Sequence, residues 1–140
     1  MRSSGHGQGP AASGPPPSLG DIEALAAAAF AELPAPFKAP LGPVVIRVEE
    51  FADAETEAAM GLEDPLDLLG LYRGVALPLK SVSDPLPRTD MIFLYRRPIL
   101  DYWCDSGENL ADIVRHVLIH EIGHHFGFSD ADMERIEKAG

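Results

Sequence analysis

One stretch, residues 120–130, restricts the possible folds of this chain more than any other feature. It reads His-Glu-Ile-Gly-His-His-Phe-Gly-Phe-Ser-Asp. In a helix, His120 and His124 stand one turn apart on the same face, so both imidazoles can bind a single cation. Glu121 lies about 100° further round the helix, beside such a cation, where its carboxylate can take a proton from water. The stretch therefore predicts a helix that carries a metal site.

The residues after the two histidines suggest a third ligand. Gly127 can end the helix in a left-handed conformation and turn the chain back, which makes Asp130 the candidate. Asp130 also has a structural explanation, because it follows Ser129 in the first turn of a new helix, where the helix dipole favours aspartate. Asp132 is better explained as the capping partner of Ser129. The pattern from His120 to Asp130 would arise in on the order of 1 in 10,000 shuffled chains. The remaining alternative is a helix whose histidines only form hydrogen bonds near the edge of the core.

Five other side chains could support such a site. His116 lies one turn before the first ligand and too far along the helix to share an ion with both, so we interpret it as a supporting or solvated residue. His125 points away from the first ligand, and we interpret it as a hydrogen-bonded helix residue or as part of a cleft wall. Tyr72, Tyr95 and Tyr102 could each donate to an oxyanion, but we favour core or rim positions for all three.

Charge and hydropathy together argue against two classes of partner, nucleic acids and membranes. The chain has 22 acidic and 11 basic residues and a net charge of −11, so we expect no binding to nucleic acid. No apolar run approaches the ~20 residues of a membrane span, and we expect a cytoplasmic protein that does not enter membranes.

Cys104 is the only cysteine, and we expect it to be buried apolar filler.

Periodicity and turn residues predict one domain with an N-terminal tail. Residues 1–19 are rich in Gly, Pro and Ser, which predicts a disordered tail, and residues 20–140 form the predicted single domain. The predicted strands are 44–50, 69–77 and 91–96, and the last is apolar enough to be covered on both faces. The predicted helices are 18–33, 52–60, 98–104, 109–126 and one starting at Ser129. These elements predict an α+β fold, in which a small mixed sheet of about three to four strands packs on helices.

The motif and the preceding strands resemble the compact bacterial zincin-like metallopeptidases. The resemblance rests on the pattern from His120 to Asp130, on residues 91–95 (Met-Ile-Phe-Leu-Tyr) and on residues 69–75, and it covers roughly residue 40 to the C-terminus. It implies a zincin-like fold in which the long C-terminal helix carries a zinc ion held by His120, His124 and Asp130. It implies that Glu121 is the general base. It also assigns the positioning of an extended peptide to the strand 91–96.

The sequence thus predicts a zinc-dependent hydrolase, specifically a minimal metallopeptidase that acts on a peptide or protein substrate. Two imidazoles and a carboxylate are a ligand set of hydrolytic zinc, and they leave a position for water. Two alternatives stay open, a metal-stabilised binding domain without proteolytic turnover and a metallohydrolase that acts on another carbonyl compound. The sequence makes no prediction of the oligomeric state.

Overall fold

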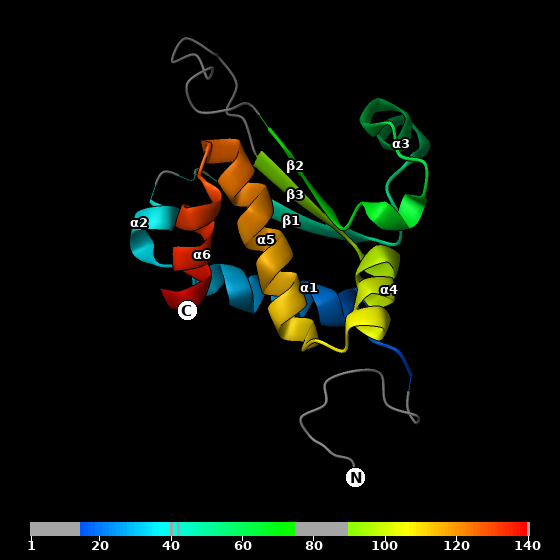
Figure 1. Cartoon of the computed structure of the whole chain (residues 1–140), viewed down its shortest axis with the longest axis horizontal. Helices are drawn as coiled ribbons and strands as arrows, with labels where there is room; N and C mark the ends of the chain where they lie inside the picture. Colours follow the sequence, from blue (N-terminus) through cyan, green and yellow to red (C-terminus); the bar gives the residue numbers. More distant parts are fainter. Residues whose placement is uncertain (1–14, 40, 42, 75–89, 140) are drawn as a thin grey trace.

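The computed structural model describes residues 15–39, 41, 43–74 and 90–139, apart from the side chains at positions 36, 125, 126, 130 and 139. Helices pack against one small sheet (Figure 1). The elements in chain order are α1 (Leu19–Ala31), α2 (Ala35–Lys38), β1 (Val44–Glu49), α3 (Ala54–Met60), the 3-10 turn η1 (Pro65–Asp67), β2 (Gly70–Arg73), β3 (Asp90–Tyr95), α4 (Arg96–Ser106), α5 (Leu110–Phe126) and α6 (Asp130–Ala139). The predicted α+β class with a small mixed sheet is confirmed.

The sheet of the described residues has the strand order β1-β3-β2. β1 runs parallel to β3, with Ile46 opposite Ile92, and β2 runs antiparallel to it, with Tyr72 opposite the same Ile92. β3 is therefore the central strand. The assignment of peptide positioning to residues 91–96 is wrong, because hydrogen bonds to β1 and β2 occupy both edges of β3.

Both faces of β3 are covered, as its continuous apolar sequence predicts. Ile92 and Leu94 point toward the main core, which is built with α1, α4, α5 and α6. Phe93 and Tyr95 point to the opposite face, where they pack with Ala52 and half-buried neighbours. Figure 1 shows α5 crossing in front of the strands, with α1 behind α5 and below the strands and α3 at the upper right. The period of two along a strand produces this division, because successive side chains alternate between faces.

The helix α5 begins and ends at side-chain and backbone signals that the sequence carries. The Asn109 side chain accepts hydrogen bonds from the backbone N–H groups of Ala111 (2.9 Å) and Asp112 (3.3 Å). At the other end Gly127 has φ 72°, and the N–H of Phe128 donates to the carbonyl of Gly123 at 2.8 Å. This is the geometry of a left-handed helix end, which reverses the chain after the histidines.

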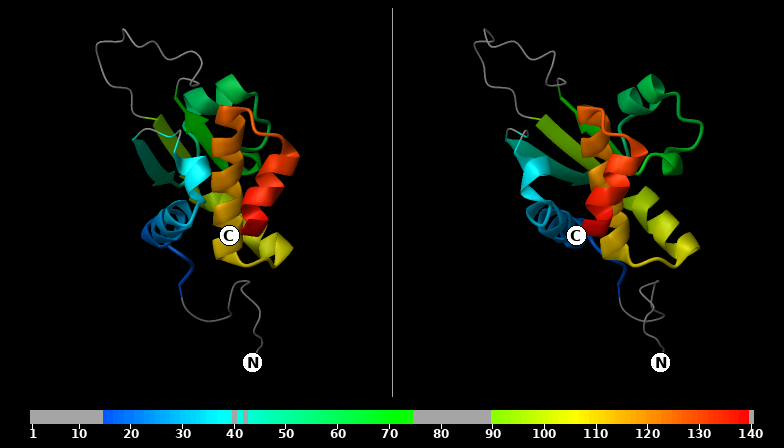
Figure 2. Two further views of the ribbon diagram at one scale, coloured as in Figure 1. Left: turned by 90° about the vertical axis from the view of Figure 1, so that its left-hand side faces the viewer. Right: turned by 60° about the vertical axis from the view of Figure 1, so that its left-hand side comes forward.

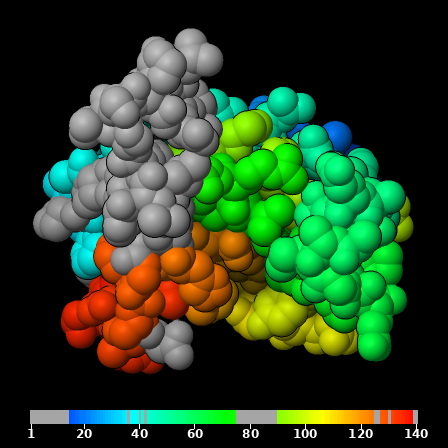
Figure 3. Space-filling view, turned by 90° about the horizontal axis from the view of Figure 1, so that it is seen from above, coloured from blue at the N-terminus to red at the C-terminus, as the bar shows by residue number. Residues whose placement is uncertain are grey.

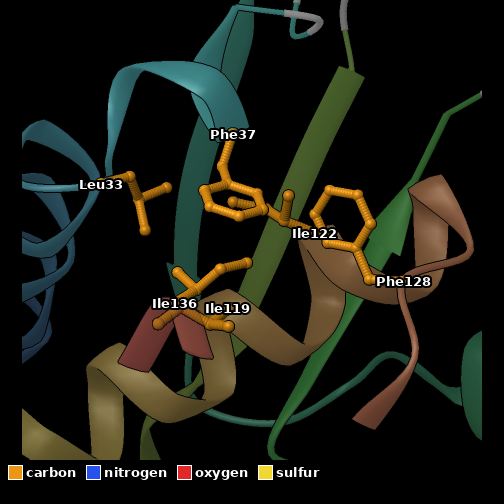
Figure 4. Close-up of a pocket in the computed structure, with 6 residues that line it drawn as sticks. All are labelled: Leu33, Phe37, Ile119, Ile122, Phe128 and Ile136. Carbon is orange, nitrogen blue, oxygen red and sulfur yellow. The ribbon is translucent and has the colours of Figure 1, made fainter. Parts of the chain in front are cut away.

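Apolar side chains hold the turn after α5. They line a small pocket on the side of the helix away from the ligand histidines. Figure 4 shows the side chains that line this pocket, which are Leu33, Phe37, Ile119, Ile122, Phe128 and Ile136. The rings of Phe37 and Phe128 meet edge to face with centroids 5.4 Å apart. Figure 2 shows the consequence, since α6 (red) lies alongside α5 (orange) after a short connection. The chain direction at the start of α6 is thus fixed by packing.

Helix α4 differs from the sequence prediction in two respects. It begins at Arg96, so Pro98 lies inside its first turn, where the missing N–H removes no helical hydrogen bond. Cys104 is exposed, so the expectation that it is buried is wrong. The reason is orientation, because Ile99 and Trp103 fill the buried face of α4 and Cys104 follows on its outer side.

Within the part of the chain that the structure describes, no helix has the length and apolar character needed to cross a membrane.

Candidate metal centre

The two histidines predicted as ligands lie side by side on α5. The rings of His120 and His124 have centroids 5.8 Å apart and planes at 87° to each other. Two imidazoles that bind one tetrahedral zinc at Zn–N distances of ~2.1 Å have centroids roughly 5 Å apart. His120 is half-buried and His124 is exposed, so the pair is open to solvent on one side. The position and the chemistry of this pair fit a metal ion with an open coordination position.

The side chain of Glu121 extends from α5 toward the edge strand β2. One of its carboxylate oxygens, Oε1, accepts a hydrogen bond from the backbone N–H of Tyr72 at 3.1 Å. Burial raises the pKa of Glu121, while the nearby His124 and the Tyr72 N–H group partly offset this effect. The carboxylate is therefore held in place and keeps a greater proton affinity than a solvated glutamate.

The close approach of β2 to α5 depends on Gly70. A Cβ atom at this position would lie 2.6 Å from Cγ1 of Val117 and 3.1 Å from the carbonyl oxygen of Phe93. Any larger residue would force the strand and the helix apart. The sequence gave no indication that the Tyr72 N–H is the group brought to Glu121.

The structure shows the main chain of the third predicted ligand but does not describe its side chain. Asp130 is the first residue of α6, two residues after the apolar contact made by Phe128. Ser129 and Asp132 exchange hydrogen bonds between their side chains and backbone N–H groups at 3.1 and 3.2 Å, as the sequence predicts. Asp132 therefore has a capping role, and the assignment of Asp130 as a ligand stays a prediction. The side chain of His125 also lies outside the described part of the chain.

The three tyrosines have different surroundings. Tyr95 is buried, and burial raises its pKa to about 12, with nearby Glu49 as the next contribution. The Tyr72 hydroxyl lies next to the carboxylate of Asp90, and its pKa is raised mainly by burial. Tyr102 is exposed, and its hydroxyl donates to Glu108 at 2.7 Å. Core positions for Tyr72 and Tyr95 and a rim position for Tyr102 agree with the sequence interpretation.

A surface pocket begins one helical turn before His120. Its lining comes from α4, α5 and the segments flanking β2 and α5, and consists of Leu69, Tyr102, Glu108, Ile113, His116 and Val117. Figure 3 shows the surface hollowed where α5 (orange), α4 (yellow) and the segment from α3 to β2 (green) meet. The sequence did not predict this pocket, because its walls come from segments that are distant along the chain.

His116 has a carboxylate partner that the sequence interpretation missed. Its Nδ1 lies 2.7 Å from Oε1 of Glu137 on α6, and its ring lies 4.1 Å from the ring of His120, measured between centroids. The ligand atoms of His116, His120 and Glu137 all lie within 4.8 Å of one another. The structure thus brings together, beside the predicted ligands, a second set of side chains of the types that bind metals.

The fold and the site together have the features of one class of protein. In this class, a helix carries two histidines one turn apart and an adjacent glutamate, and it packs against an antiparallel edge strand. The family model described as zincin-like metallopeptidase matches residues 41–139, and this chain belongs to that family. A search of curated protein sequences found no match.

Proposed function

We propose that this protein is a zinc-dependent peptidase in which His120, His124 and Asp130 bind the metal and Glu121 is the general base. The observation that carries the proposal is the position of Glu121, which is adjacent to His120 in sequence and anchored on the edge strand β2. Zinc acts in such sites as a Lewis acid that lowers the pKa of water and polarises a carbonyl group. Glu121 accepts the proton of the attacking water and returns it to the leaving amine.

The environment of Glu121 suits this role. A general base works best when its pKa lies near the working pH, and burial raises the pKa of this carboxyl above the ordinary value. The N–H of Tyr72 fixes one carboxylate oxygen, which holds the side chain toward β2. Reorientation of the base during the reaction is thereby limited.

The edge of β2 is the proposed place for the peptide substrate. Leu69 accepts a hydrogen bond from the N–H of Tyr95 at 3.0 Å, so Leu69, Leu71 and Arg73 direct their backbone groups toward β3. Gly70 and Tyr72 then direct theirs away from the sheet, as in any antiparallel edge strand. Because the Tyr72 N–H already donates to Glu121, an extended peptide would pair with the other outward-facing backbone groups of β2 and would lie directly beside Glu121. β2 thus replaces the strand that the resemblance had suggested.

The experiment is a comparison of Glu121→Gln with the wild-type protein, both loaded with zinc. We expect the substitution to abolish cleavage of a peptide library, while elemental analysis shows that the zinc content is unchanged. Glu134→Gln is the matched control, because Glu134 is an exposed glutamate on α6. Unchanged turnover in Glu121→Gln would contradict the role of the base. His124→Ala tests the ligand assignment, because it should lower the affinity of the protein for the first equivalent of zinc.

The same experiment separates the peptidase from a metal-stabilised binding domain. For the binding domain, chelation lowers the melting temperature but the wild-type protein cuts no member of the library. A cleavage that depends on Glu121 rejects this alternative. Cleavage of esters or of other carbonyl compounds, without cleavage of peptides, would indicate the third class of reaction.

A further inference from the structure

A second group of metal-binding side chains lies on the side of His120 that faces α6. His116 and His120 are on successive turns of α5, and Glu137 reaches them from α6. The ligand atoms of the three side chains lie within 4.8 Å of one another, and His116 Nδ1 is 2.7 Å from Glu137 Oε1. The face of α5 that carries the proposed catalytic ligands therefore continues, one turn back, into a second set of donors.

Two contacts between α5 and α6 hold Glu137 at this place. The guanidinium of Arg115 donates to the main-chain carbonyl oxygens of Glu137 at 2.8 Å and Ile136 at 3.0 Å. Further along the helices, Met133 packs so closely on Gly123 that any Cβ atom at position 123 would overlap its side chain. The backbone of Glu137 is thus fixed before any ligand binds, which lowers the conformational entropy lost on binding.

The donor set has the chemistry of a site for zinc or a similar divalent metal. Two imidazoles and one carboxylate bind such ions at about 2.1 Å, which puts tetrahedral donors roughly 3.4 Å apart. The observed spread requires only small side-chain movements. The side chains of His116 and Glu137 are 54% and 27% exposed, so they have room to move and water can complete the coordination. If His116 and Glu137 formed only an ion pair, this exposed contact would contribute little to the stability of the fold.

We propose that His116, His120 and Glu137 form a second divalent-cation site, and that an ion bound there withdraws His120 from His124. Two ions are then bound at once: an ion from zinc in excess of one equivalent takes His120 for the second site, the first ion stays on His124 and Asp130 with one ligand fewer, and hydrolysis is inhibited. The competition rests on the proposed function, because it assumes that His120 and His124 bind the catalytic ion. The existence of the second site does not depend on that assumption.

The test uses His124→Ala, which removes one ligand of the proposed catalytic site and none of the second site. We expect this variant to bind Zn²⁺ in calorimetric titrations. Addition of His116→Ala or Glu137→Gln should weaken this binding by about tenfold or more, because each removes a direct ligand. Addition of Glu134→Gln, the matched control on α6, should leave it unchanged. Circular dichroism spectra should show that each variant keeps its helices.

The wild-type background gives an independent readout. Zinc in excess of one equivalent should slow amide hydrogen exchange in α6, and His116→Asn should remove this protection. Failure of His124→Ala to bind zinc, or equal binding with and without His116, would overturn the second site. Retained hydrolysis in Glu121→Gln would instead overturn the proposed function. The two failures are therefore distinguishable.

Discussion

The close packing of α6 on α5 leads to a prediction about Gly123, which lies inside the motif between the two ligand histidines. Alanine in place of glycine in a helix interior ordinarily stabilises a protein by about 1 kcal/mol. At Gly123 the added methyl group would overlap the buried side chain of Met133, and overpacking of this kind costs about 1–3 kcal/mol. We therefore expect Gly123→Ala to change the free energy of unfolding of the metal-free protein by between zero and about −2 kcal/mol, the sum of these two effects.

A double-mutant cycle isolates the contact. Met133→Ala alone should cost about 2–5 kcal/mol, because Met133 is buried and a cavity remains. In that background the methyl group of Gly123→Ala meets no obstruction, so the substitution should stabilise by about 1 kcal/mol or more. The coupling between the two positions is then about 1–3 kcal/mol, which equals the overpacking cost.

Urea unfolding followed by circular dichroism measures these differences through shifts in the midpoint at constant slope. Equal stabilisation by Gly123→Ala in the wild-type and Met133→Ala backgrounds would refute the close approach of the two helices. A displaced α6 would also move Glu137 away from His116, so Gly123→Ala should weaken zinc binding in the His124→Ala background.

Three further predictions concern α5 and its contact with β2. Because burial raises the pKa of Glu121, its neutral form stabilises the fold below about pH 4.5, and this contribution is lost as pH rises through the pKa of the folded protein. Glu121→Gln should therefore raise the melting temperature of the metal-free protein at pH 7, with a difference that vanishes below pH 4; a constant difference would contradict the burial effect. Gly70→Ala should destabilise the protein by about 1–3 kcal/mol in urea unfolding, because the added methyl group would overlap Val117 and push β2 away from α5. Asn109→Ala should cost about 1 kcal/mol, measured in the same way, because two N–H groups of α5 lose their acceptor, whereas Asn109→Asp should retain most of the stability.

Features that depend on neighbouring residues could be predicted from the sequence. The start of α1 directly after residue 18, the αL residue Gly127 and the cap that Ser129 and Asp132 form for α6 all lie where the sequence placed them. The same is true of the pairing of His120 with His124, because covalent geometry puts residues four apart on one face of a helix. The apolar sequence of residues 91–95 also indicated that both faces of this strand are covered.

Features that depend on the docking of distant segments could not be predicted in this way. The order of the strands made β2 an edge strand, and the contact between Glu121 and Tyr72 joins residues 49 apart in the sequence. The orientation of α4 exposed Cys104. A sequence pattern gives the apolar face of an element, but several partners can cover that face, and the choice among them is made by long-range packing.

The sequence by itself therefore determined the helix, the two histidines and the adjacent glutamate, because these are consequences of helical periodicity over one or two turns. Only the tertiary structure decided what surrounds them. Packing against β2 gives Glu121 its backbone partner and its raised pKa, and packing against α6 brings Glu137 to His116. These contacts are set by how closely Gly70 and Gly123 let their neighbours approach, which is a property of three-dimensional packing and not of local sequence.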